Sequence, residues 1–171
     1  EDDFEDIHSK IEFLLTERLG DVGKKIHTAR SRNDQVLTAM QLLLKDELSD
    51  IKELTKDLFA TWMGLAETHK DVLLPGYTHL QVAMPSSFGL WFSAYAEALV
   101  DDVVLLNAAH NICDQNPLGS AAGYGSSFPI DRAFTTEALG FGALKVNAVA
   151  AQMGRGKTER ITANAMGSLA A

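Results

Sequence analysis

Apolar residues recur every three or four positions near the start of the chain. Over residues 3–19 this spacing places five of them on one face of a helix: Phe4, Ile7, Ile11, Leu14 and Leu15. Asp2 or Asp3 can cap the start of this helix, and Gly20 can end it. We therefore predict a helix over residues 3–19, followed by a polar turn over residues 21–25.

A much longer helical pattern covers residues 33–70. Its apolar positions again recur at three and four: Val36, Met40, Leu43, Leu44, Leu48, Ile51, Leu54, Leu58, Trp62 and Leu65. At 1.5 Å per residue such a helix is about 55 Å long. Its apolar stripe is buried either against partner subunits or in a monomeric bundle with an overhanging end. The length favours partner subunits.

Residues 85–113 predict a second long helix, apolar around nearly its whole circumference. A helix of this kind is either buried in protein or spans a membrane. Glu97 and Asp101 lie in mid-length and argue against a membrane span. We therefore expect the central helix of a bundle, with Pro85 in its first turn and Gly89 allowing a close neighbour.

Apolar and polar residues alternate over residues 77–85, between the two long helices. Alternation is typical of a strand, but a strand without a partner is not stable. We therefore predict an extended loop at this position.

The last third of the chain predicts shorter elements. Residues 116–127 are rich in small side chains, which indicates either a flexible linker or an ordered loop. Asp131 is expected to cap a short helix ending near Leu139, and a last helix is expected to start near Asn147. With no coherent set of strands, the whole pattern predicts an all-α fold of bundled long helices.

Composition narrows the class of protein. The chain has 171 residues, enough for one hydrophobic core, and a formal net charge of −8. An acidic surface argues against nucleic acid as a partner. Cys113 is the single cysteine, which excludes an internal disulfide and fits a reducing compartment. The acidic start of the chain does not resemble a signal peptide.

Residues 26–36 form the first candidate site. Arg30 and Arg32 lie among Ser31, Asn33 and Asp34, which are residue types that cap helices. This run is either a helix start with solvated basic side chains or a site whose arginines, asparagine and helix N–H groups hold carboxylates.

Thr78 and His79 form the second candidate site. On the residues alone, His79 is either a loop histidine bonded to the backbone or a proton-transfer group. The two sites follow opposite ends of the predicted long helix, about 55 Å apart. They therefore either serve different sites or meet between subunits. No histidine pair has a metal-binding spacing, and the single cysteine has no companion.

Five strings, in this order, resemble the argininosuccinate lyase family: Glu5-Asp6-Ile7-His8, HTARSRNDQ at 27–35, GYTHLQVAMP at 76–85, PLGSAAG at 117–123 and Phe128-Pro129-Ile130-Asp131-Arg132. The likeness covers nearly the whole chain, and HTARSRNDQ is specific within the fumarase/aspartase superfamily. It implies an all-α long-helix bundle of the L-aspartase-like type and a homotetramer whose active sites are built from three subunits. It also implies that residues 1–31 end an N-terminal helical domain and that residues 32–171 begin the central bundle domain.

The resemblance implies cleavage of argininosuccinate to L-arginine and fumarate, in arginine biosynthesis and the urea cycle, in the cytoplasm. It implies neither a cofactor nor a metal. The expected partners are the substrate argininosuccinate and further copies of the chain, and neither nucleic acid nor a membrane is expected as a partner. His79 would be the catalytic proton-transfer residue. Ser31, Arg32, Asn33 and Thr78 would bind substrate, and His8 and Gln81 would have supporting roles.

Two departures from the family limit this interpretation: the family's serine loop and its N-terminal part, which also contacts substrate, are both missing. The family's GSSxMPxKxNP loop, which carries a catalytic serine, has no counterpart in these 171 residues. The chain is therefore expected to be a central fragment, inactive alone. The alternatives are a sibling fumarate-releasing lyase and a non-catalytic, crystallin-like structural helical module.

Overall fold

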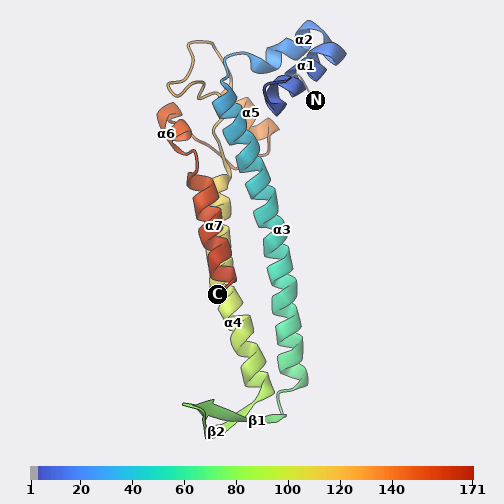
Figure 1. The fold of residues 1–171 in the computed structure, drawn as a ribbon, viewed down its shortest axis with the longest axis vertical. Coiled ribbons are helices and arrows are strands. Elements are labelled where there is room, and N and C mark those ends of the chain that lie inside the picture. Colours follow the sequence, from blue (N-terminus) through green and yellow to red (C-terminus); the bar gives the residue numbers. More distant parts are fainter. Residues whose placement is uncertain (1–3) are drawn as a thin grey trace. The chain divides into compact units, whose positions relative to one another are not determined.

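The computed structural model describes residues 4–171, which fold mainly as helices (Figure 1). The chain divides into two compact units. Unit 1 contains the residues up to Leu43 together with Asp114–Lys157. Unit 2 contains Leu44–Cys113 and Thr158–Ala171. Within the described residues, no helix combines the length and apolar character that a membrane span requires.

Unit 1 begins with the predicted helix, which starts later than expected. Helix α1 covers Ile7–Leu19, and the Asp6 carboxylate caps it by accepting the Ser9 N–H at 2.8 Å. The predicted caps Asp2 and Asp3 lie outside the described residues. Gly20 ends the helix as predicted, with φ +62°, a conformation that glycine adopts without strain. The predicted turn is instead a short helix α2, Asp21–Lys24, and a 3-10 turn η1, Lys25–His27.

Helix α3 covers Arg32–Thr68 without a break, so the predicted long helix over residues 33–70 is confirmed (Figure 1). Its 37 residues correspond to a length of about 55 Å. The helix begins in unit 1 and continues through unit 2. Gly64 does not interrupt it, because a single glycine in a helix interior costs only about 1 kcal/mol.

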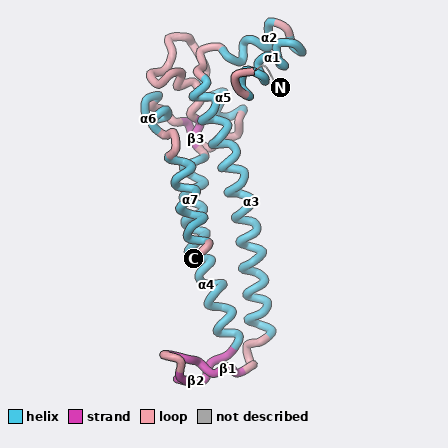
Figure 2. The backbone as a smooth tube through the Cα atoms, in the orientation of Figure 1, coloured by secondary structure: helices cyan, strands magenta, loops and turns pink. Residues whose placement is uncertain are grey.

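A β-hairpin follows α3, so the prediction of an extended loop was wrong (Figure 2). Strand β1, Leu73–Thr78, pairs antiparallel with β2, Gln81–Ser87. The partner strand that the sequence did not predict is β1. It contains Pro75 and Gly76, which are residue types uncommon in strands. Pro75 lies opposite Pro85, and neither has an N–H to donate to the ladder. Pro85 is therefore in the hairpin and not in the first turn of the next helix.

Helix α4, Phe88–Cys113, and helix α7, Lys157–Leu169, supply most of the remaining core of unit 2. The fully enclosed cluster joins three helices through Leu48, Leu106, Ala109, Cys113 and Ala165. The prediction that α4 is buried all round is not met within one chain, because Leu90 and Val104 are more than 60% exposed. Only one face of α4 packs against the rest of unit 2.

The remainder of unit 1 is a set of short elements. Helix α5, Arg132–Ala138, is capped by Asp131 as predicted, and α6, Ala148–Met153, is capped by Asn147. Strands β3, Gln115–Asn116, and β4, Ala143–Leu144, pair in parallel. The predicted single last helix is two helices, because the chain turns between Gly154 and Gly156, where φ is +78°. The absence of strands was therefore predicted wrongly, while the mainly helical class is confirmed.

Candidate functional site

The first candidate site is the N-terminus of α3, where the chain forms a reciprocal cap. The Ser31 hydroxyl accepts the Asn33 backbone N–H at 3.2 Å. In return, the Asp34 carboxylate accepts the Ser31 backbone N–H at 3.0 Å. This arrangement satisfies two N–H groups that a helix start leaves without partners. It also fixes the backbone that carries Arg32 and Asn33.

Asp34 ties this helix start to a loop that lies 85 residues later in the sequence. Its second carboxylate oxygen accepts the N–H of Gly119 at 3.2 Å and that of Ala121 at 3.0 Å. The side chain is completely buried. Burial raises the pKa of Asp34, although its hydrogen bonds to the backbone of Ser31, Ala121 and Gly119 favour the charged form.

The glycine-rich loop over residues 117–123 is ordered, which decides between the two interpretations of its sequence. Ser120 is completely buried, and its hydroxyl accepts from Gln152 Nε2 at 2.8 Å. Arg132 Nε donates to the Leu118 carbonyl at 2.8 Å. Gly119 has φ +85°, and a Cβ there would lie 2.8 Å from Arg132 Cγ. The loop therefore requires glycine at this position and is held from several sides.

Arg32, a predicted substrate contact, engages two carboxylates of its own chain. Its guanidinium donates to Glu5 at 2.9 Å and to Asp6 at 3.0 Å. These bonds raise the pKa of Arg32, those to Glu5 most strongly. The pKa of Asp6 falls to about 2, chiefly because Asp6 accepts the Ser9 backbone N–H. The guanidinium is thus suitably placed to hold carboxylates, and a substrate would have to displace Glu5 and Asp6.

Asn33 is another predicted substrate-binding residue. Its side chain is held by a residue that the sequence did not single out. Arg155 Nη1 donates to Asn33 Oδ1 at 3.3 Å. Arg155 lies in the turn between α6 and α7, and both side chains are solvent-exposed. Arg155 lies between two glycines, and nothing in this local sequence predicts its contact with Asn33.

His8 lies near the same helix start, half-buried in α1. It lines a cavity of about 260 Å³ together with Glu12, Arg30, Gln35 and Thr38. The predicted supporting residue His8 is therefore in the same unit as Ser31, Arg32 and Asn33. This group places basic, amide and hydroxyl side chains around one helix N-terminus, a combination that suits anions.

The second candidate site is the tip of the β-hairpin in unit 2. Thr78 ends β1, Gln81 begins β2, and His79 and Leu80 form the two-residue turn between them. Both turn residues have positive φ, +50° for His79 and +63° for Leu80. Positive φ at both central positions defines the hairpin turn that normally takes Asn-Gly. His79 is exposed there.

The predicted site residues thus fall into two groups. Ser31, Arg32, Asn33 and His8 belong to unit 1, while Thr78, His79 and Gln81 belong to unit 2. The first group lies at the start of α3, and the second follows its end. Sequence reasoning did not identify Arg155 or the role of Asp34, although the spacing of Ser31 and Asp34 is that of a capping box.

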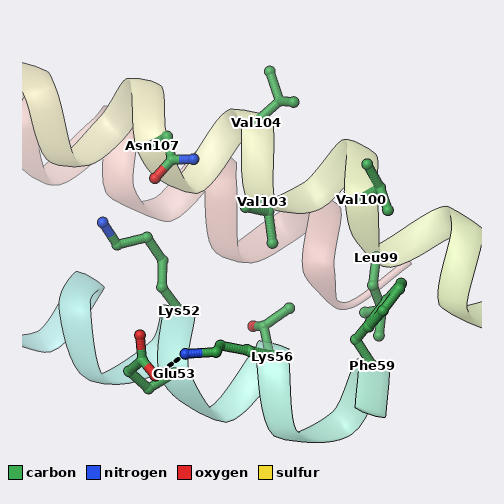
Figure 3. Close-up of a pocket in the computed structure, with 10 residues that line it drawn as sticks. Lys52, Glu53, Lys56, Phe59, Leu99, Val100, Val103, Val104 and Asn107 are labelled. Carbon is green, nitrogen blue, oxygen red and sulfur yellow. Dashed lines mark hydrogen bonds and ion pairs between the residues drawn. The ribbon is translucent and has the colours of Figure 1, made fainter. Parts of the chain in front are cut away.

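A separate groove in unit 2 contains none of the predicted site residues. Its volume is about 520 Å³, and it lies between α3 and α4 (Figure 3). Phe59 and Leu99 meet at one end, and Lys56 pairs with Glu53 at 2.9 Å. Its lining combines apolar side chains of α4 with Lys52, Lys56 and Asn107, and the Lys56 ammonium is already paired with Glu53. Among residues 4–171, no three His, Cys, Asp or Glu side chains are grouped to hold a metal ion.

The protein family whose description is Lyase matches residues 1–168. The chain belongs to this lyase family. A curated argininosuccinate lyase from Phocaeicola vulgatus is 60% identical over 170 residues, which cover 99% of this chain. The corresponding protein from Parabacteroides distasonis is 60% identical over 171 residues, and that from Stenotrophomonas maltophilia is 48% identical over 164. The predicted resemblance to argininosuccinate lyases is confirmed, and the chain spans about 38% of the length of these relatives.

Solved structures give the same fold. An EDDS lyase variant with bound fumarate superposes with a TM-score of 0.84 at 28% identity, covering 90% of this chain and 31% of that chain. A Brucella melitensis fumarate lyase:delta crystallin superposes at 0.67, with 22% identity over 80% of this chain and 31% of that chain. The second likeness shows the fold alone. The predicted all-α bundle class is confirmed by these neighbours.

Proposed function

We propose that the lyase containing this chain cleaves argininosuccinate to L-arginine and fumarate, as a step of arginine biosynthesis. The observation that carries this proposal is the 60% identity to argininosuccinate lyases over 99% of the chain. The donor cluster at the start of α3 supports it, because the substrate and both products carry carboxylates. The reaction needs no redox group, and we propose that it takes place in the cytoplasm.

The proposed reaction is an elimination. A base removes a proton from the carbon beside one carboxylate of the succinyl half, and the resulting carbanion is stabilised as a dianion on that carboxylate. The carbon–nitrogen bond then breaks, the electron pair leaves with the guanidino nitrogen, and an acid protonates it. Fixed donors aimed at the developing charge contribute most to such catalysis.

The residues divide between these tasks in the proposal. Ser31, Arg32 and Asn33 hold carboxylates, with the cap of α3 fixing their backbone. Thr78 donates to the succinyl half from the end of β1. His79 transfers a proton, which an imidazole can do near neutral pH. Its positive φ supports a functional role, because strained backbone conformations are frequent at active sites. His8 and Gln81 support these groups.

We further propose that neighbouring subunits of a homotetramer supply parts of each site. The supporting observation is the unbroken α3, whose first and last residues are about 55 Å apart. The exposed apolar side chains of α4, Leu90 and Val104 among them, also suit burial by partner helices. The division into an N-terminal domain up to residue 31 and a central bundle domain from residue 32 remains a prediction.

The test is a fumarate absorbance assay on the product of the full gene that contains this chain. Argininosuccinate is expected to yield fumarate, and His79→Ala is expected to reduce kcat by at least about a hundredfold. The exposed position of His79 means that the variant should fold normally, which circular dichroism checks. The 171-residue chain alone is expected to be inactive, because it contains no serine loop. Full activity of His79→Ala would contradict the assignment of the base or acid to this histidine.

A sibling fumarate-releasing lyase is the second candidate, supported by the TM-score of 0.84 to EDDS lyase. Such enzymes share the fumarate half of the reaction and differ in the group that leaves. Offering the same preparation argininosuccinate, adenylosuccinate, aspartate and malate separates the candidates. Fumarate from one of the last three, with none from argininosuccinate, would replace the first proposal with the second.

A further inference from the structure

The contact between Arg155 and Asn33 determines which way the Asn33 amide faces. An asparagine side chain offers an acceptor on one side and two N–H donors on the other. A guanidinium has five N–H donors and no acceptor. Because Arg155 Nη1 lies 3.3 Å from Asn33, the amide atom that faces it is the oxygen, Oδ1. The Nδ2 group is therefore turned away from Arg155.

This orientation matches the chemistry of the proposed ligand. A carboxylate only accepts hydrogen bonds, so it requires the Nδ2 side of the amide and is repelled by Oδ1. If the amide rotated by half a turn, Asn33 would present its oxygen to the ligand. Holding Oδ1 on a cation removes that alternative, and the donor is presented without further ordering on binding.

The position of Arg155 is itself built from both sides. Asp34, buried one residue after Asn33, holds the loop over residues 117–123 through Gly119 and Ala121. Gln152, three residues before Arg155, holds the same loop through the Ser120 hydroxyl at 2.8 Å and the Ala121 carbonyl at 3.1 Å. The loop thus connects the start of α3 to the end of α6. Gly154 and Gly156 then turn the chain around Arg155.

We propose that Arg155 is a positioning residue for dicarboxylate binding, which it assists by fixing the Asn33 amide with its N–H groups toward the ligand. The proposal rests on the proposed role of Asn33 in holding a carboxylate. Arg155 acts through Asn33 and does not itself contact the reacting atoms. Loss of Arg155 therefore weakens binding of the fumarate half of the ligand and has little effect once Asn33 is absent.

The test is a double-mutant cycle on the full-length protein, with fumarate as the probe and calorimetry as the measurement. Arg155→Met is expected to weaken fumarate binding about tenfold, the effect of one charge-assisted hydrogen bond. Combining Arg155→Met with Asn33→Ala is expected to bind no worse than Asn33→Ala alone, because the two residues act as one unit. Arg155→Lys should recover part of the affinity, since an ammonium is also a donor without an acceptor.

Lys157→Met is the matched control, because it removes an equal charge two residues away, at the exposed first position of α7. It should bind fumarate as the unaltered protein does. An equal loss in Lys157→Met would show a general charge effect and overturn the proposal. An undiminished effect of Arg155→Met in the Asn33→Ala background would also overturn it. Turnover of argininosuccinate reports separately on the proposed function, so fumarate binding that depends on Arg155 without turnover would contradict that function and leave this proposal standing.

Discussion

The carboxylate of Asp34 accepts the backbone N–H of Ala121 at 3.0 Å and so joins the start of α3 to the glycine-rich loop. The same carboxylate caps α3 through Ser31 and accepts from Gly119. One buried side chain therefore satisfies three backbone donors from two distant segments. This connection sets the surroundings of the proposed carboxylate site.

Asp34→Asn should destabilise unit 1. An amide oxygen can replace one carboxylate oxygen, but its NH2 group would face N–H donors in place of the other. We expect the free energy of unfolding to fall by about 2 kcal/mol, the usual cost of leaving buried donors unsatisfied. Urea denaturation followed by circular dichroism measures the change.

The pH dependence of this difference gives a second measurement. Burial raises the pKa of Asp34 above its unfolded value. The folded protein therefore binds the Asp34 proton more tightly than the unfolded chain does. Protonation of Asp34 raises the free energy of unfolding as pH falls through the folded pKa, and this gain is complete below the unfolded pKa near 4. The stability difference between the unaltered protein and Asp34→Asn should widen on acidification from pH 7. A difference that narrows would contradict the direction of the shift.

Asp6 should titrate in the opposite sense. Its pKa is lowered to about 2, first by the Ser9 backbone N–H and then by the Ser9 and Arg32 side chains. Its contribution to stability is therefore complete above the unfolded pKa near 4 and is lost as pH falls through about 2. Carboxyl chemical shifts recorded by NMR should give a midpoint near the lower value. In Arg32→Gln the midpoint should rise only part of the way, because the helix cap remains.

Replacing Leu80 with glycine should relieve backbone strain in the turn of the β-hairpin. Leu80 has φ +63° and is 99% exposed, so its side chain contributes strain without compensating burial. We expect Leu80→Gly to raise the free energy of unfolding by about 0.5–1 kcal/mol. The control is Glu97→Gly, at an exposed position within α4, which should lower it by a similar amount. Thermal melts of the two variants that shift in the same direction would argue against strain at Leu80.

Two helical glycines should respond oppositely to alanine. A Cβ on Gly89 would lie 2.6 Å from Lys70 Cα and 2.9 Å from the Ala66 carbonyl oxygen, so the helix would have to move. Gly89→Ala should therefore destabilise unit 2 by about 1–3 kcal/mol. A Cβ on Gly64 meets nothing within 4 Å, and Gly64→Ala should stabilise α3 by about 1 kcal/mol. Denaturant unfolding of both variants tests the pair, and equal effects would exclude a close approach at Gly89.

Local signals in the sequence predicted much of the helical framework. Gly20 and Asp131 mark helix ends because their effects depend on neighbouring residues along the chain. The long periodic run predicted α3 to within a few residues. The same local reading failed at β1, because Pro75 and Gly76 are poor strand residues whose suitability is decided by the partner strand. The sequence pattern also predicted α6 and α7 as one helix. A glycine weakens a helix by an amount that packing can override, so the glycines alone did not show that the helix ends there.

The candidate site shows the same division. The local sequence from Arg30 to Asp34 is sufficient to place basic, amide and hydroxyl groups at a helix start. The burial of Asp34 against Gly119 and the contact between Arg155 and Asn33 arise only in the folded chain. Helix capping is encoded within four residues, whereas a contact across more than eighty depends on how the intervening chain packs. Hydrogen bonds between distant segments form only after burial has brought those segments together.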